Sequence, residues 1–152
     1  MSIFQSLNIT ASALTAQRLR MDVISSNMAN IDTTRARLIN GKWEPYRRKL
    51  VVMEPRQEDF NTYLQAAMNR SGSVGNGVKV TKIIEDSTPF KLVYDPSHPD
   101  AGPDGYVRLP NVDPLKEMVD LIGATRSYEA NVTVFNASKG MLMKALEIGK
   151  SS

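Results

Sequence analysis

Hydrophobic residues near both ends of the chain recur at heptad-like spacing, whereas those in the middle alternate in short runs. Stripes this narrow are typical of seams that pack against another helix, and we expect them to form an assembly interface. The N-terminal seam comprises Leu7, Leu14, Met21, Ile24, Met28 and Ile31. The C-terminal seam comprises Met118, Leu121, Tyr128, Val132, Phe135, Leu142 and Leu146.

The N-terminal pattern predicts one long helix. Ser2 and Gln5 have capping-box spacing, and neither glycine nor proline occurs before Asn30, which is expected to end the helix. Thr10 and Gln17 occupy core-type positions of the stripe. Polar residues at such positions tune register or partner choice at some cost in stability.

The C-terminal pattern predicts a second long helix. Asp113 is a favourable N-cap, and Pro114 suits the first helical position. The helix is expected to run to about Ile148, with Gly149 as its stop.

The middle of the chain reads as short strands and turns. Alternation predicts strands over residues 46–53, 78–81, 90–94 and 106–109, separated by stretches rich in proline and glycine. Apolar residues between 58 and 70 have helical spacing instead, which predicts one short helix there.

These elements together predict an α+β fold. The two long helices pair antiparallel in a coiled-coil-like manner as a discontinuous domain of residues 1–34 and 111–152. Residues 35–110 form a small β-rich module inserted between them.

Composition narrows the function classes. The 152 residues carry a net charge of +3 and no cysteine, which excludes disulfides, zinc–thiolate sites and thiol catalysis. No apolar run approaches the roughly 20 residues of a membrane span, and the N-terminus does not read as a signal peptide. The basic run 46–49 is interpreted as the solvent face of a strand. We expect neither nucleic-acid binding nor membrane insertion.

Candidate chemistry is sparse. His98 lies near Asp95, Asp100 and Asp104, but the intervening prolines prevent a shared helix face, so a solvated turn is preferred to a metal site. The glycine-rich stretch 72–77 lacks the Gly-Lys-Ser/Thr ending of a phosphate loop. With a single histidine the usual general base is missing. We expect no enzyme, no catalytic residue, no metal and no cofactor.

Several motifs are shared with a known family. They are Ala13–Gln17 leading into Ser25–Thr34, then Gly105–Asp113, and Arg126–Asn131 in the C-terminal helix. Residues 45–49, 77–80 and 91–94 extend the match into the middle. The chain thus resembles the bacterial flagellar basal-body rod and hook family, and its proximal-rod members most. Residues 35–41 depart from the Gly-aromatic-Lys sequence of the distal-rod and hook relatives. The motif positions are Ser26, Asn27, Asn30, Asn111, Asp113, Tyr128 and Asn131.

The resemblance implies a structural subunit of the proximal rod. Such subunits polymerise helically into a hollow drive shaft that transmits torque and conducts exported subunits, with the terminal helices inside and the β-rich module outside. The implied partners are further copies of the chain and other rod proteins, which include the distal rod and the adaptor that joins the rod to the export gate and MS ring. The flagellar type III export apparatus is an implied partner while the subunit is in transit. The implied location is the basal body outside the cytoplasmic membrane, reached without a cleaved signal peptide. A soluble helical-hairpin adaptor or export chaperone is the alternative.

Overall fold

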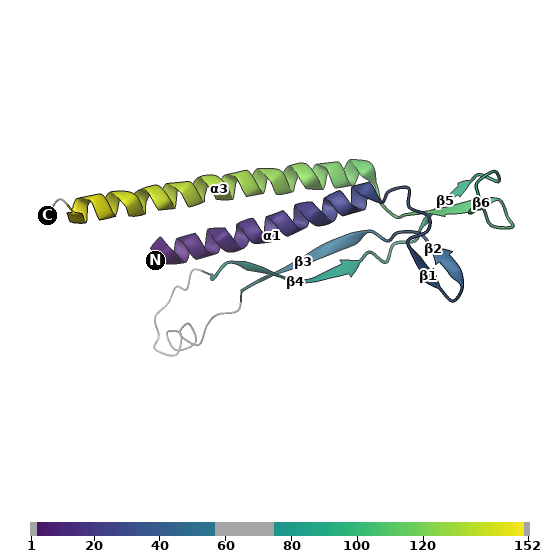
Figure 1. Cartoon of the computed structure of the whole chain (residues 1–152), viewed down its shortest axis with the longest axis horizontal. Helices are drawn as coiled ribbons and strands as arrows, with labels where there is room; N and C mark the ends of the chain where they lie inside the picture. Colours follow the sequence, from purple (N-terminus) through teal and green to yellow (C-terminus); the bar gives the residue numbers. More distant parts are fainter. Residues whose placement is uncertain (1–2, 57–74, 151–152) are drawn as a thin grey trace. The chain divides into compact units, whose positions relative to one another are not determined.

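The computed structural model describes residues 3–56 and 75–150, which form two long helices and three two-stranded sheets (Figure 1). Because the strands lie together between the two helices and pair in small sheets, the α+β class expected from the sequence is confirmed. The elements in chain order are α1 (Ile3–Ala29), β1 (Arg37–Ile39), β2 (Lys42–Glu44), β3 (Lys49–Pro55), β4 (Val78–Glu85), β5 (Lys91–Tyr94), β6 (Tyr106–Leu109) and α3 (Pro114–Lys150).

The ends of the helices follow the predicted caps. The Asn30 amide donates to the carbonyl of Ser26 at 2.9 Å and accepts from Thr33 Oγ1 at 3.1 Å, so its side chain closes the last turn of α1. At the start of α3, Asp113 Oδ1 accepts the N–H of Leu115 at 3.1 Å, as an N-cap does. The stop predicted at Gly149 is wrong by a short margin, since α3 continues to Lys150.

The sheets confirm the four predicted strands and add a hairpin, although the strand predicted from residue 46 begins only at Lys49. β3 pairs with β4, and β5 pairs antiparallel with β6. The hairpin of β1 and β2 was not predicted, although its Asn40-Gly41 turn is a strong sequence signal. Both turn residues have positive φ, at 51° and 76°, as a type I′ turn requires. The helix expected near 58–70, and Ser2 of the capping box, lie outside the described residues.

The chain divides into two compact units, each with parts of both helices. The first unit comprises Met1–Leu19, Val52–Lys82 and Ala124–Ser152, and the second comprises Arg20–Val51 and Ile83–Gly123. No helix in the described part of the chain is both long and apolar enough to cross a membrane.

Small side chains form the interior of the first unit. Thr10, Ala16, Ala124 and Ser138 are its buried residues on the two helices. Ser138 Oγ lies 3.3 Å from the hydroxyl of Ser6, so α1 and α3 touch through hydroxyl groups there. The buried side chains on the two helices of this unit are therefore small, and each buries little apolar area.

The start of β4 also packs directly on α1. Ser12 Oγ accepts the N–H of Val78 at 3.1 Å. A Cβ at Gly77, whose φ is 93°, would lie 2.2 Å from the same hydroxyl. Only glycine fits this conformation and this approach, so Gly77 fixes where the strand meets the helix.

The second unit has a mixed core. Its buried apolar side chains are Val23, Ile24, Tyr46, Val107 and Val112. The same unit also buries Asn27, Arg48 and Glu117, and buried charged residues are unusual in proteins.

A buried polar network as the candidate functional site

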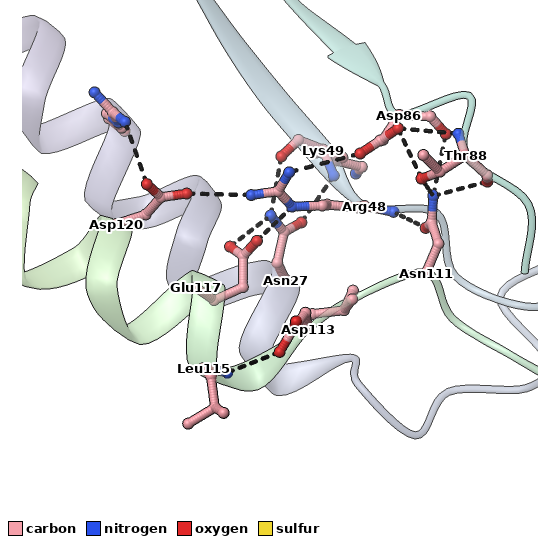
Figure 2. A network of polar contacts seen from close by, with 12 residues as sticks. Asn27, Arg48, Lys49, Asp86, Thr88, Asn111, Asp113, Leu115, Glu117 and Asp120 are labelled. Carbon is pink, nitrogen blue, oxygen red and sulfur yellow. Dashed lines mark hydrogen bonds and ion pairs between the residues drawn. The ribbon is translucent and has the colours of Figure 1, made fainter. Parts of the chain in front are cut away.

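Arg48 lies at the centre of a charged network in the second unit (Figure 2). Its Nε donates to Glu117 Oε1 at 2.5 Å, and its two terminal nitrogens reach Asp120 at 3.2 Å and Asp86 at 3.5 Å. Glu117 is 0% exposed and Arg48 is 7% exposed. Asp120 also lies 3.8 Å from Arg20 on α1. One buried guanidinium therefore ties the residue before β3 to the first turns of α3.

Asn27 connects the same carboxylate to α1. Its Nδ2 donates to Glu117 Oε2 at 3.0 Å and to the Lys49 carbonyl at 2.9 Å. Its Oδ1 accepts the Lys49 N–H at 2.9 Å and the Tyr46 hydroxyl at 3.0 Å. Both donor hydrogens and both acceptor positions of the buried amide are thus used. The Ser26 hydroxyl lies 3.4 Å from the Tyr46 hydroxyl and extends the set.

Asn111 holds the other side of Arg48. Its Oδ1 accepts the Arg48 N–H at 2.8 Å, and its Nδ2 donates to the carbonyls of Asp86 and Thr88 at 3.2 and 3.1 Å. Asp86 in turn accepts from the N–H and the hydroxyl of Thr88 at 3.0 and 2.8 Å. Residues from four separate stretches of chain therefore share one continuous network (Figure 2).

The pKa values of the network favour its charged state. Burial alone lowers the pKa of Arg48, but the hydrogen bond and charge of Glu117, aided by Asp86 and Asp120, raise it above its ordinary value. The hydrogen bonds from Thr88 lower the pKa of Asp86, and Arg48 lowers it further. The guanidinium and the Asp86 carboxylate are therefore both charged at neutral pH.

A buried ion pair of this kind specifies geometry more than it adds net stability. Removing charges from water costs several kcal/mol per ion, roughly what their attraction returns. The main effect of the network is to raise the free energy of any conformation in which the buried Glu117 carboxylate is separated from Arg48. It fixes the register of α1 against α3 in this unit, and it offers no nucleophile, general base or open ligand position.

The motif residues inferred from the resemblance fall into three places. Ser26, Asn27 and Asn111 belong to the network, whereas Asn30 and Asp113 cap the helices beside it. Tyr128 and Asn131 lie on α3 in the first unit, where the Asn131 amide donates to the Ser127 carbonyl at 2.8 Å.

The predicted seam residues are mostly half-buried in the single chain. Ile24 is buried, whereas Met118 and Leu146 are exposed, the latter by 63%. The others are of intermediate exposure and comprise Leu7, Leu14, Met21, Met28, Ile31, Leu121, Tyr128, Val132, Phe135 and Leu142. Their role as an assembly interface stays a prediction.

Sequence reasoning missed Tyr46, Arg48 and Glu117. The prediction that residues 46–49 form a solvent-facing run is wrong for Tyr46 and Arg48, which are buried. The burial of these two residues could have been predicted from strand alternation, because a strand places Tyr46, Arg48 and Leu50 on one face. Nothing in the sequence identified Glu117 as the partner, because that contact spans 69 positions.

The segment around His98 is a hydrogen-bonded turn. Asp95 Oδ1 accepts the N–H and the hydroxyl of Ser97 at 3.1 and 2.6 Å, and His98 Nδ1 accepts the Asp100 N–H at 3.0 Å. The Asp100 carboxylate pairs with Arg35 at 2.5 Å. Asp95 and His98, two of the side chains that suggested a metal site, thus hold the turn together. Among the described residues, no group of three or more His, Cys, Asp and Glu residues could hold a metal ion.

Comparisons with known proteins agree with the motifs. Residues 7–37 match the flagella basal body rod protein family, and residues 104–148 match the C-terminal region of the flagellar basal body rod FlgEFG proteins. The chain is 66% identical to the flagellar basal-body rod protein FlgC of Bacillus subtilis, over 99% of this chain and 100% of the relative. It is 45% identical to FlgC of Borreliella burgdorferi, over 97% and 98% of the two chains. It is 40% identical to FlgC of Salmonella typhimurium, over 99% and 100%. The chain therefore belongs to the FlgC family of flagellar basal-body rod proteins, which are structural proteins and not enzymes.

Proposed function

We propose that this structural rod protein assembles helically, with α1 and α3 as a coiled-coil-like inner layer and the β-rich residues 35–110 outside. Residues 1–34 and 111–152 would then form the inner domain around a hollow channel. The observation that carries the rod assignment is identity of 66% to a flagellar rod protein over its entire length. Two features support the layer arrangement: the helical seams, and the large apolar side chains of α3 that stay exposed in the single chain.

Large apolar side chains on α3 are exposed in the single chain. On its first turns Leu115, Val119 and Ile122 are exposed, and towards its end Leu146 and Ile148 are exposed. Contiguous apolar patches of this kind mark interaction sites in soluble proteins. The small residues that bury the helix contacts of the first unit contribute little apolar area. Neighbouring subunits would supply the missing burial, and a heterologous contact that does not close produces a filament.

The proposed partners follow from this assembly. They are further copies, other rod proteins including the adaptor to the export gate and MS ring, the distal rod, and the type III export apparatus in transit. Export without a cleaved signal fits helices that are only marginally stable before assembly.

A soluble adaptor or export chaperone is the competing function. A chaperone would need no β-rich module, and it would not be expected to match a rod protein over its whole length. The 66% identity over 100% of a rod protein therefore favours the rod subunit. Cell fractionation separates the two functions. A rod subunit remains in detergent-resistant basal bodies, whereas a chaperone stays in the cytoplasmic fraction.

Charge substitutions on the seams test the assembly. We expect Leu14→Asp, Phe135→Asp and Leu146→Asp to abolish motility and to leave basal bodies without the variant protein. Leu146→Asp is the most specific test of assembly, because Leu146 is exposed in the single chain and its substitution should leave the fold of the monomer intact. Lys79→Asp on the exposed face of β4 serves as the control and should swim normally. Normal motility of all three seam variants would refute the interface.

A further inference from the structure

We propose that the outer edge of β5 pairs with the same edge of a second copy of this chain. The two strands run antiparallel about a two-fold axis at Val93 and join two small sheets into one larger sheet. The sheet of β5 and β6 lies wholly within the second unit (Figure 1). Because a two-fold contact closes on itself, it yields a pair of free chains and does not depend on the filament proposed above.

The outer edge of β5 has free backbone hydrogen-bonding groups. The Asp95 N–H donates to the Gly105 carbonyl at 3.0 Å, and these two residues are opposite each other when the register of the sheet is continued by one position. Hydrogen-bonded and non-hydrogen-bonded pairs alternate along an antiparallel ladder, so the N–H and C=O groups of Leu92 and Tyr94 point away from β6. No other strand among the described residues pairs with β5. This edge is therefore open to a further strand.

The outer edge of β6 is protected, in contrast to that of β5. The Gly102 N–H donates to the Tyr106 carbonyl at 2.9 Å, so the loop before β6 covers part of this edge. The exposed Arg108 follows on the same strand. Covering loops and charged side chains are the means by which proteins keep sheet edges from pairing with other chains. Only β5 presents an edge that such features leave uncovered.

Large apolar side chains are exposed along β5. Leu92 and Tyr94 are 65% and 66% exposed, and Val93 between them is 43% exposed. An exposed apolar edge strand favours pairing with a strand of another chain. Pro89 and Pro96 lie on either side of the strand, and proline has no N–H to donate. The pairing is therefore confined to the short segment between the two prolines.

The sequence of this segment is complementary to itself when two copies run antiparallel. The two-fold axis at Val93 places Lys91 of one copy opposite Asp95 of the other. It also places Leu92 opposite Tyr94, and the outward N–H and C=O groups of these two residues then form hydrogen bonds with each other. Cross-strand pairs of opposite charge and of apolar side chains both stabilise neighbouring strands. The chemistry of the edge thus selects a second copy of the chain as its partner.

Both charges of the segment are available for this contact. Neither Lys91 nor Asp95 has an ion-pair partner among the described residues. The Lys91 ammonium donates only to the Val112 carbonyl, at 3.3 Å. Hydrogen bonds from Ser97, and to a lesser extent the charge of His98, lower the pKa of Asp95, so its carboxylate is charged at neutral pH.

Proline substitution tests the edge. Sedimentation equilibrium of the purified full chain measures the dissociation constant of the pair, which is weak because so short a contact is small. Leu92→Pro removes one outward N–H from each copy and retains the ladder to β6. We expect the dissociation constant to rise at least about tenfold. Arg108→Pro is the matched control, because Arg108 lies opposite Leu92 and its N–H points to the other edge of the sheet.

The control variant should pair like the unmodified chain. An unmodified chain that stays monomeric at its highest soluble concentration would overturn the proposal. Equal pairing by Leu92→Pro would also overturn it, because the copies would then associate through another surface.

Charge exchange tests the antiparallel register. Lys91→Glu sets two acidic residues opposite each other, and Asp95→Lys sets two lysines opposite each other, so each variant alone should pair at least about fivefold more weakly. When the two variants are mixed, every charge again faces an opposite charge, and mixed pairs should form about as tightly as those of the unmodified chain. Mixed pairs no tighter than those of either variant alone would contradict this register.

Disulfide formation tests the position of the axis. The chain has no cysteine, so Val93→Cys introduces a single thiol. The two Val93 positions form a non-hydrogen-bonded pair with Cα atoms about 4.5 Å apart, which is within the range of a disulfide. We expect Val93→Cys to give a covalent dimer in air, whereas Tyr106→Cys, at a similarly exposed position of β6, should stay reduced. Equal cross-linking of the two variants would refute the pairing through β5 and leave the rod assignment intact.

Discussion

Separating Arg48 from Glu117 is the most informative perturbation of the fold. In Arg48→Leu the fully buried Glu117 carboxylate loses its cation, while Asn27 remains as its hydrogen-bond donor. Leaving one member of a buried pair uncompensated costs about 3–5 kcal/mol. With an m-value of about 2 kcal/mol per M, the midpoint of urea unfolding should fall by about 2 M. The measurement is helical circular dichroism of the purified chain against urea concentration.

The double variant Arg48→Leu/Glu117→Leu completes the thermodynamic cycle. Removing both charges should cost less than Arg48→Leu alone, because Asp86 and Asp120 are partly exposed and regain water. We expect a coupling free energy of at least about 2 kcal/mol. Additivity within about 0.5 kcal/mol would refute the view that the pair acts as a unit.

An exposed ion pair provides the comparison. Lys144 and Glu147 lie 2.7 Å apart near the end of α3, with side chains 78% and 63% exposed. Lys144→Met should change the free energy of unfolding by less than about 0.5 kcal/mol, as surface pairs do. A cost similar to that of Arg48→Leu would mean that distance, and not burial, sets the effect.

Three further predictions concern the surroundings of the pair. Asn27→Asp should destabilise the fold by about 2–4 kcal/mol, since a carboxylate would replace the donor to Glu117, and urea unfolding checks this. Asp113→Ala should cost about 1 kcal/mol by removing the N-cap of α3, and an equal cost for Asp113→Asn would contradict the capping role. The pKa of Asp86 is lowered in the fold, so its contribution is present above the unfolded pKa of about 4 and is lost as pH falls through the folded value. Stability measured between pH 6 and pH 2 should fall at the acid end, and Asp86→Asn should flatten that dependence.

Much of the fold is local and could be predicted from the sequence. The two long helices, their caps at Asn30 and Asp113, and four of the strands follow from periodicity and from residues that act on adjacent backbone. The hairpin of β1 and β2 was equally local, because the Asn40-Gly41 turn specifies it, and it was overlooked.

The network could not be predicted because its contacts cross long stretches of sequence. Asn27 and Asn111 were singled out by their motifs, but their partners Arg48 and Glu117 were not. From sequence alone, a basic residue in a short predicted strand is expected to face solvent unless a buried acidic partner is known. For Arg48 that partner is Glu117 on α3, which lies 69 positions away in the sequence.

The sequence by itself therefore determined the helices, the strands and the family, because periodicity, caps and motifs are properties of neighbouring residues. Only the tertiary structure decided which polar residues are buried together and which apolar residues are left exposed. The physical reason is that burial depends on residues brought together from distant parts of the chain. Glu117 and Leu146 illustrate both outcomes: a charged residue with no solvent exposure, and a seam leucine that stays 63% exposed in the single chain.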